Sequence, residues 1–399
     1  MLDFSVFEKI AERFATPVYV YEERKIKEAL QRLRESIDAN GITGGILYAM
    51  KANSNPEILK TLFHNHIGGV DAVSPGEIAL ALEAGFQPSQ IVFTGNNITD
   101  KEMDFAVEKK VHFLNIDSLS RLEKFGEKYG GSKIWIRINS SIGAGHHSYC
   151  ITGGPESKFG IWHTDVRKAK QIAKKYGLKI DGLHQHIGSQ ILEVKIFLKA
   201  MDALLKIAKD FPELNFLDFG GGLGVPYQPG ETPLDVEKLG KEMLKRFRVF
   251  CQIYGRKVAL ILEPGRYLVA EAGYLLVRVN TIKRVNSRIF AGVDSGFNHL
   301  IRPVMYGSYH EIVNISNPRG RKEKVDVVGY LCESGDKFAT QRVISHVRED
   351  DFLVIKTAGA YGYSMSSNYN GRPKPAEVLV ETDGNLRLIR PRETLDDLI

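Results

Sequence analysis

Several polar side chains of this sequence stand where apolar, strand-like runs come to an end. Lys51 follows "ILYAM", Asp71 lies within "GGVDAV", and Glu263 follows "VALIL". Lysine and acidic residues are seldom buried unless they are paired or take part in chemistry. A lysine amine can form a covalent bond with a carbonyl compound, so Lys51 is a candidate catalytic residue.

Strands and helices in regular alternation would position these side chains. Patterns of helical period separate eight β-rich runs, which cover residues 46–51, 68–74, 90–96, 111–117, 133–139, 179–188, 214–222 and 257–265. This β/α alternation over about 220 residues predicts a (β/α)8 TIM-like barrel. An open doubly wound sheet can show the same alternation, but it usually has fewer units.

The sequence changes in character after Arg266. Short β-branched runs without a helical period are separated by turn residues, at 274–285, 288–296, 324–333 and 351–362. They predict a second, all-β domain. We therefore expect a barrel domain over residues 25–266 and an all-β domain over residues 267–399. The segment 1–24, which contains the strand-like "TPVYVYE", would join the all-β domain.

The composition is that of an ordinary globular protein, with 43% hydrophobic and 26% charged residues. The net charge of +6 is spread along the chain, without the clustered basic runs typical of nucleic-acid or membrane binding. Cys150, Cys251 and Cys332 are too few and too far apart for a disulfide framework. The N-terminus has no apolar signal core, and no apolar run is long enough to span a bilayer. We predict a cytoplasmic protein that binds neither nucleic acid nor a membrane.

A barrel of this kind carries its chemistry at the carboxyl-terminal ends of its strands. The unusual polar residues and glycines gather at those ends: Lys51, Asp71, Arg137, Asn139, His184, His186, Ser189, Gly220, Gly221, Gly222, Gly224, Glu263, Gly265 and Arg266. A capping or turn role explains each of them singly. It explains poorly why they all gather on one rim.

The glycine run "GGGLG" follows the seventh strand, where such barrels often bind phosphate through free backbone N–H groups. A phosphate there and a lysine after the first strand indicate a phosphorylated aldehyde cofactor. Pyridoxal 5'-phosphate fits, because it forms a Schiff base with a lysine amine, here Lys51, and acts as an electron sink. Glu263 would keep the pyridine nitrogen protonated, and His186 could stack on the ring.

The "HQH" motif at residues 184–186 also permits a metal site, because residues i and i+2 of a strand point the same way. The sequence offers no third ligand at a suitable spacing, so we predict no metal site.

Together these motifs resemble those of the diaminopimelate decarboxylases, a pyridoxal-phosphate family built like alanine racemase and eukaryotic ornithine decarboxylase. The resemblance runs almost end to end, from "TPVYVYE" to "RPKPAEVLV". "YAMKAN" resembles the family's Schiff-base motif and "HQHIGSQ" its ring-stacking strand, while "GGGLG" and "EPGR" resemble its phosphate and pyridine-nitrogen contacts. The predicted cofactor site contains Lys51, Asp71, Arg137, His186, Ser189, Gly220, Gly221, Gly222, Glu263, Gly265, Arg266 and Tyr361.

Substrate recognition rests on "LIRPVMYG", "CESGD" and "AGAYGYSMSSNYNGRPKPAEVL". The resemblance implies that Arg266, Arg302 and Tyr306 hold the distal carboxylate of the substrate. It implies that Glu333 meets the distal ammonium and that Tyr361 touches cofactor and substrate. An arginine suits the carboxylate because its planar fork donates two hydrogen bonds.

The resemblance further implies that Cys332 is the proton donor and that "CESGD" enters the partner subunit's site in a head-to-tail homodimer. The predicted reaction is decarboxylation of meso-2,6-diaminopimelate to L-lysine and CO2, the last step of lysine biosynthesis. Two residues depart from the family pattern, namely Tyr330 and Thr357, where proline and aspartate are common.

The sequence leaves other functions open. A sister decarboxylase could act on carboxynorspermidine or a basic amino acid, and a racemase could use the same scaffold. A pyridoxal-phosphate-binding protein without catalytic activity would need only the cofactor pocket, and the presence of both Cys332 and Glu333 argues against it.

Overall fold

The computed structural model describes residues 2–37 and 44–399, which group into two compact units. We call the first the β unit; it contains Met1–Glu28, Pro226–Thr232 and Leu268–Ile399. The second, the barrel unit, contains Ala29–Val225 and Pro233–Tyr267. The domain boundaries expected after residues 24 and 266 remain predictions.

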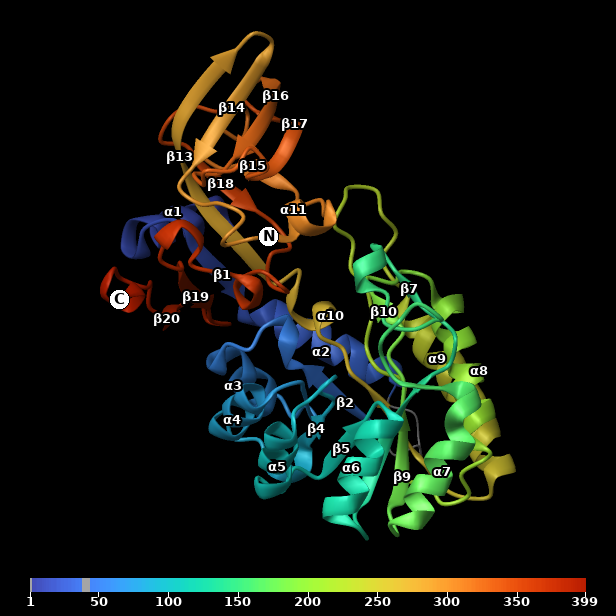
Figure 1. Cartoon of the computed structure of the whole chain (residues 1–399). Coiled ribbons are helices and arrows are strands. Elements are labelled where there is room, and N and C mark those ends of the chain that lie inside the picture. Colours follow the sequence, from blue (N-terminus) through green and yellow to red (C-terminus); the bar gives the residue numbers. More distant parts are fainter. Residues whose placement is uncertain (1, 38–43) are drawn as a thin grey trace. The chain divides into compact units, whose positions relative to one another are not determined.

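Eight parallel strands form a closed barrel, which confirms the predicted fold class (Figure 1). In their order around the barrel they are β2 (Gly44–Ala49), β3 (Gly69–Ala72), β4 (Ile91–Phe93), β5 (Phe113–Ile116), β6 (Lys133–Asn139), β9 (Lys179–His184), β11 (Phe216–Asp218) and β12 (Ala259–Leu262). The barrel closes where β12 pairs with β2, with Leu262 opposite Ile46.

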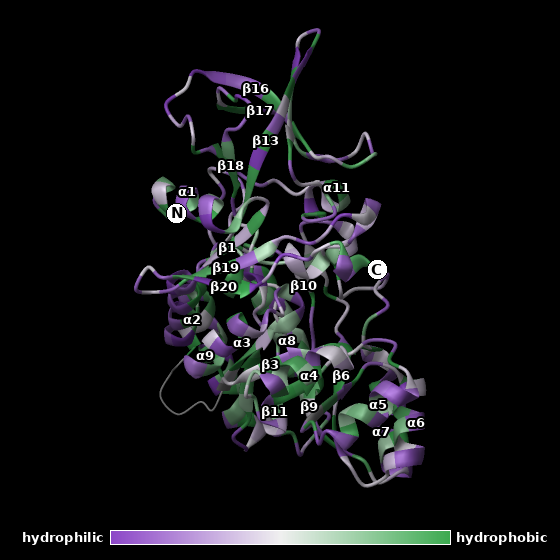
Figure 2. Cartoon of the chain, turned by 90° about the vertical axis from the view of Figure 1, so that its left-hand side faces the viewer, coloured by the Kyte–Doolittle hydropathy of each residue, from purple (hydrophilic) through white to green (hydrophobic). Residues whose placement is uncertain are grey.

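Seven helices follow the first seven barrel strands: α3 (Pro56–His64), α4 (Pro75–Glu83), α5 (Asp100–Glu108), α6 (Leu119–Tyr129), α7 (Val166–Lys175), α8 (Val194–Ala208) and α9 (Val236–Tyr254). Hydrophilic and hydrophobic residues alternate along these helices (Figure 2). This pattern is typical of amphipathic helices that bury one face and expose the other. Asn55, Ser74, Thr99 and Ser118 begin four successive helices, each with a side chain that accepts a backbone N–H of the first turn.

Strand β12 is followed only by the four-residue helix α10 (Arg266–Val269). The remaining place in the helical ring is filled by α2 (Glu23–Ile37), which precedes the first barrel strand. Helices α2 and α9 touch at Gly240, where an added Cβ would lie 2.0 Å from the carbonyl oxygen of Ser36. Glycine is therefore the residue that permits this contact.

The β unit is a sheet in the order β17-β16-β14-β13-β1-β19-β20, with β18 pairing to β13 and to β15. The bounds are β1 (Val18–Glu22), β13 (Gly273–Val285), β14 (Arg288–Val293), β15 (Ile312–Asn314), β16 (Lys322–Val328), β17 (Lys337–Ser345), β18 (Phe352–Ile355), β19 (Ala376–Val380) and β20 (Leu386–Arg390). Strand β1, from the start of the chain, runs antiparallel to β13 and parallel to β19.

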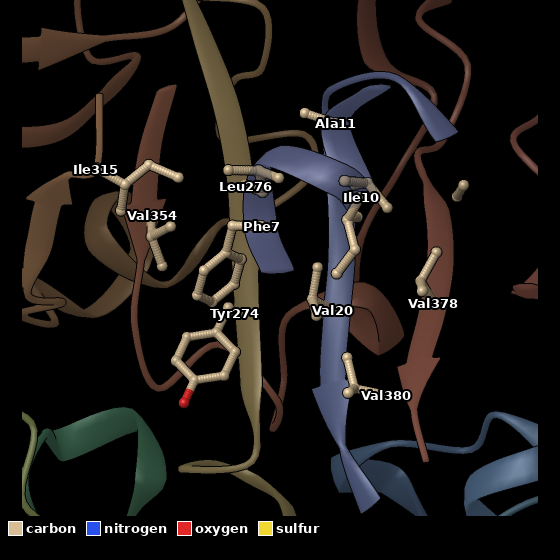
Figure 3. Packing of buried hydrophobic residues seen from close by; sticks show 12 residues of the cluster. Phe7, Ile10, Ala11, Val20, Tyr274, Leu276, Ile315, Val354, Val378 and Val380 are labelled. Carbon is tan, nitrogen blue, oxygen red and sulfur yellow. The ribbon is translucent and has the colours of Figure 1, made fainter. Parts of the chain in front are cut away.

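A hydrophobic core joins the N-terminal helix α1 (Phe4–Phe14) to this sheet (Figure 3). Phe7 and Ile10 of α1 are fully buried, and the Phe7 ring packs edge-on against Tyr274 at 5.2 Å between centroids. Val20 and Val378 lie in the same core, on neighbouring strands. This shared core explains why β1, near the start of the chain, lies in the same unit as β19, near its end.

The β unit also contains a short helix that no pattern in the sequence predicted. The segment "LIRPVMYG" contains the helix α11 (Arg302–Tyr306), although no helical period was visible there. A helix of five residues makes little more than one turn, so it is too short to show a period.

Among the described residues, no helix combines the length and apolar character needed to cross a bilayer.

Candidate active site

Lys51 lies two residues beyond the end of β2, in the short 3-10 helix Met50–Ala52. Its amine forms an ion pair with Asp71 of β3, and the Thr94 hydroxyl donates to the other oxygen of that carboxylate. Burial and nearby Glu263 raise the pKa of Asp71, while Lys51 and Thr94 oppose that shift. The buried carboxylate thus holds the lysine at the carboxyl end of the barrel.

His186 follows β9 and lies against the glycine run that follows β11. Its Nδ1 accepts the backbone N–H of Gly221 at 3.1 Å, so the ring carries its proton on Nε2. Burial, together with Arg137 and Lys51, lowers the pKa of His186 well below its ordinary value. A neutral imidazole is therefore present at physiological pH.

The glycine run has the conformation that only glycine adopts easily. Gly220 and Gly222 have φ angles of 70° and 95°, in the left-handed region. An added Cβ at Gly221 would lie 2.1 Å from the carbonyl oxygen of Glu263. The loop therefore brings its backbone closer to the strand ends than a side chain would allow.

Ser189 and Arg266 meet on the same rim, where Arg266 Nη2 donates to Ser189 Oγ at 3.0 Å. Ser189 belongs to the two-residue strand β10 (Gly188–Ser189), which pairs with β7 (Ala144–Gly145). The Gly/His-rich loop of residues 140–160 thus folds back beside the strand end that carries His186, and Thr152 Oγ1 donates to the His186 carbonyl oxygen at 3.1 Å. Arg137, buried at the end of β6, donates to the same carbonyl at 3.4 Å.

Glu263 is the centre of a buried hydrogen-bond chain. Asn115 Nδ2 donates to His184 Nδ1 at 2.6 Å, and His184 Nε2 in turn lies 3.1 Å from Glu263 Oε2, to which it donates. Burial acts to raise the pKa of Glu263, but His184, Lys51 and His186 outweigh it and lower that pKa to about 2. Glu263 is therefore an ionised carboxylate inside the barrel.

Asp218, at the end of β11, completes a group of three with His184 and Glu263. One ligand-type atom of each lies within 4.8 Å of those of the other two, and all three residues are buried. Neither Asp218 nor Glu263 could be recognised from the sequence as a third ligand beside the two histidines of "HQH", because both come from other strands of the barrel. His186 does not belong to this group. Both ring nitrogens of His184 form hydrogen bonds, one with Asn115 and one with Glu263.

These features fit pyridoxal phosphate. An amine lies at a strand end, a strained glycine loop and a Ser–Arg pair suit a phosphate, and a neutral imidazole suits a ring face. An ionised carboxylate, Glu263, suits a protonated pyridine nitrogen. The barrel residues of the predicted site lie within the last three residues of a barrel strand or in the segment that follows one. They are Lys51, Asp71, Arg137, His186, Ser189, Gly220, Gly221, Gly222, Glu263, Gly265 and Arg266.

Apart from Arg266, which lies in the barrel unit, the predicted substrate residues belong to the β unit, where Arg302 is 1% exposed. Its Nη1 lies 3.2 Å from His310 Nε2, its Nη2 donates to Ser308 Oγ at 3.2 Å, and its guanidinium lies 4.5 Å above the Tyr227 ring. His310 Nδ1 is 2.8 Å from the Lys356 carbonyl oxygen, so it carries the proton and leaves Nε2 to accept from Arg302. The guanidinium is thus held in a fixed orientation.

Cys332 and Glu333 are exposed in a loop between β16 and β17. Asp336 shapes this loop, because its carboxylate accepts the backbone N–H groups of Leu331 at 2.8 Å and Phe297 at 2.7 Å. The Glu333 carboxylate accepts from the Tyr369 hydroxyl at 2.7 Å. Two further predicted residues, Tyr306 and Tyr361, end α11 and follow β18; Tyr361 has a φ of 56°.

Sequence reasoning missed the residues that orient those it found: Asn115, Asp218, Tyr227, Ser308 and His310. Asp218 directly precedes "FGGG", so a buried acid before a glycine run was a signal that could have found it. The sequence contains no signal for Tyr227 or His310, because no motif links either residue to Arg302.

The pyridoxal binding domain of the pyridoxal-dependent decarboxylases is the family model that matches residues 23–270. Fold and site therefore define a pyridoxal-dependent decarboxylase. The chain is 45% identical to diaminopimelate decarboxylase of Methanothermobacter thermautotrophicus, covering 98% of this chain and 92% of that one. It is 38% identical to that of Aquifex aeolicus, with the same two coverages. The chain belongs to the diaminopimelate decarboxylase family.

Solved structures agree. Diaminopimelate decarboxylase from Helicobacter pylori, complexed with L-lysine, superposes with a TM-score of 0.90 at 37% identity and covers 98% of both chains. Lysine/ornithine decarboxylase from Vibrio vulnificus, complexed with putrescine, has a TM-score of 0.81 over 94% of this chain and 97% of that one. At 20% identity, this second likeness shows the fold alone.

Proposed function

We propose that this chain decarboxylates meso-2,6-diaminopimelate to L-lysine and CO2, as a pyridoxal-phosphate-dependent carboxy-lyase. The observation that carries the proposal is 45% identity across nearly the whole chain to a diaminopimelate decarboxylase. The rim of the barrel supports it independently, because it gathers the residue types that this chemistry needs.

Pyridoxal phosphate would be held by Lys51 through its aldehyde, by the glycine run with Ser189 and Arg266 at its phosphate, and by Glu263 at its pyridine nitrogen. When bound, it supplies an electron sink for the pair released as CO2 departs. Asp71 keeps Lys51 at the strand end, and His186 offers a neutral ring face. Glu263 remains ionised and so favours a proton on the nitrogen opposite.

The substrate carries an amino acid group at each end. Arg302, held by His310 and Tyr227, would bind the distal carboxylate with Tyr306, while Glu333 would meet the distal ammonium. Cys332 would donate the proton that replaces the lost carboxylate. We further propose a head-to-tail homodimer in which Cys332 and Glu333 act in the partner's site; their exposure in the single chain supports this.

The test is an amino-acid analysis after the purified protein is incubated with pyridoxal phosphate and meso-diaminopimelate. Equal amounts of L-lysine and CO2 are expected. Parallel incubations with L-lysine, ornithine and carboxynorspermidine test the sister decarboxylases, and recovery of an epimerised substrate without CO2 tests racemisation. Cofactor binding without any product would contradict the proposed reaction and leave a binding protein.

A further inference from the structure

Two carboxylates face each other inside the barrel, and the proposed mechanism uses only one. Asp218 ends β11 and is 0% exposed, while Glu263 follows β12 and is 3% exposed. The two strands are paired neighbours, with Asp218 opposite Ile261. Oxygens of the two side chains lie within 4.8 Å of each other.

One oxygen of each carboxylate has a donor. Asp218 Oδ1 accepts the backbone N–H of Gly220 at 2.8 Å, and Glu263 Oε2 accepts from His184 Nε2 at 3.1 Å. The other two oxygens, Asp218 Oδ2 and Glu263 Oε1, are buried, and no donor of the described part of the chain reaches them. Two buried carboxylates this close together would be costly to keep ionised at the same time in a dry interior.

We propose that Asp218 is a carboxylic acid at neutral pH and that its Oδ2 proton is donated to Glu263 Oε1. One proton satisfies both oxygens and removes the repulsion between them. Asp218 is then a positioning residue, because it fixes Glu263 without touching substrate. That Glu263 faces the pyridine nitrogen rests on the proposed function; the location of the proton does not.

The charges around the pair favour this single proton. Burial first, and then neighbouring Glu263, raise the pKa of Asp218 well above its ordinary value. The ionisable groups that face the pair come from four other barrel strands or the segments just after them: Lys51, Asp71, Arg137, His184 and His186.

As a consequence, the Glu263 carboxylate accepts hydrogen bonds from two donors. Glu263 accepts from His184 on one oxygen and from Asp218 on the other, which holds it ionised and prevents its rotation. A carboxylate fixed in this way is preorganised to accept a hydrogen bond from a protonated ring nitrogen.

The first test is infrared spectroscopy of the cofactor-loaded, full-length protein labelled with ¹³C at its aspartate carboxyl carbons. We expect a carbonyl band of a protonated aspartic acid at neutral pH, its loss in Asp218→Asn, and its retention in Asp181→Asn. Asp181 is a matched control, because it is also a buried aspartate on a barrel strand. Absence of the band in the unsubstituted protein, or its survival in Asp218→Asn, would overturn the proposal.

A metal ion between the two oxygens is the other way to satisfy them. Elemental analysis of the same sample decides this. We expect no stoichiometric metal, and one bound cation per chain that is lost in Asp218→Asn would overturn the proposal.

The second test compares two substitutions. Asparagine keeps an acceptor for Gly220 and a donor for Glu263, so Asp218→Asn should bind pyridoxal phosphate within about threefold of the original affinity. Asp218→Val has neither group and should bind it at least about tenfold more weakly. If the two variants lost affinity equally while both remained folded, the donated hydrogen bond would be disproved.

The pH dependence of stability has a definite sign. Below the pKa of an unfolded aspartate, about 3.9, both states are protonated. Above it the unfolded chain loses the proton and the folded protein keeps it, so the stability contributed by this group falls as pH rises. The thermal midpoint of the original protein should therefore fall relative to that of Asp218→Asn from about pH 5 to about pH 8. A constant difference between the two midpoints would contradict a protonated Asp218.

These measurements need no substrate. If diaminopimelate were not decarboxylated but the band and the pH trend were observed, the proposed function would fail and the proton assignment would stand. Turnover of diaminopimelate without the band would have the opposite meaning.

Discussion

At the residue scale, the protonation states of the ionisable side chains inside the barrel depend on the groups next to them. Lys51 is paired with Asp71, and Glu263 accepts from His184. The surroundings set the protonation state, since His186 is held neutral and Glu263 ionised. Such opposed environments are typical of catalytic sites, where acids and bases need different pKa values.

Replacing Lys51 by alanine tests the covalent attachment of the cofactor. We expect Lys51→Ala to remain folded but to lose the visible absorbance of the lysine-bound cofactor and all measurable lysine production, because the amine that is paired with Asp71 at the strand end is removed. Absorbance titration with pyridoxal phosphate measures this. Lys60→Ala, on the outer helix α3, is the matched control and should bind cofactor normally; equal behaviour of the two variants would contradict the assignment.

Replacing Cys332 by alanine separates cofactor binding from proton transfer. Cys332→Ala should keep the cofactor absorbance while kcat falls roughly 10²- to 10⁴-fold, the usual worth of a positioned proton donor. Cys251→Ala in α9 provides a cysteine control that should keep its activity. Normal turnover by Cys332→Ala would exclude it as the donor.

At the element scale, short turns at strand ends do the positioning. The glycine run after β11 combines left-handed backbone with close approach, and the loop around Asp336 and the helix α11 carry the predicted substrate residues. The strands form the rigid scaffold, and the turns that follow them determine the positions of the predicted functional groups.

Two alanine substitutions separate backbone strain from crowding. Gly222 and Gly230 have φ angles of 95° and 88°, but an added Cβ meets the Gly188 carbonyl oxygen at 2.6 Å only at Gly222, and nothing within 4 Å at Gly230. Gly230→Ala should cost about 1–2 kcal/mol from the left-handed conformation alone. Gly222→Ala should cost more and also weaken pyridoxal phosphate binding. Thermal unfolding and cofactor titration measure both, and equal effects would show that close approach is unimportant.

The contacts of Arg302 predict a specificity effect. His310→Ala removes the acceptor of Arg302 Nη1, a loss of about 1–1.5 kcal/mol, and should raise KM for diaminopimelate roughly tenfold with a smaller change in kcat. His346→Ala is the control and should leave KM unchanged; His346 lies in the same unit, with its Nδ1 3.1 Å from Glu323 Oε2. An unchanged KM in His310→Ala would show that Arg302 needs no such support.

At the scale of the whole molecule, the chain divides into two compact units, and the predicted site residues are distributed over both. The barrel unit holds the predicted cofactor residues other than Tyr361, and the β unit holds Tyr361, Arg302, Cys332 and Glu333. The proposed homodimer makes each site depend on two chains, which a mixing experiment can test.

Mixed dimers provide that test. Lys51→Ala and Cys332→Ala are each inactive alone, but an equal mixture should recover about one quarter of normal activity, because half of the dimers are mixed and each of these has one intact site. Lys51→Ala mixed with Glu263→Ala is the control and should recover none, since both changes fall on the barrel side. Mixed dimers that form without recovering activity would contradict a shared site.

Much of this molecule follows from local sequence. The alternation of β-rich and helical runs determined the eight-stranded barrel, because strands and helices bury their faces at different periods. The ends of those runs identified Lys51, Asp71, His186 and Glu263. The helix α11 was missed because one turn carries no period.

The tertiary structure alone decided which residues support the others. Asp218 meets Glu263 only because β11 and β12 are neighbours, and Asn115 reaches His184 from another strand of the same barrel. His310 and Tyr227 meet Arg302 although Tyr227 lies far away in the sequence. Periodicity shows which residues are buried, but the partner of a buried polar group is set by strand order and register, which no single segment contains.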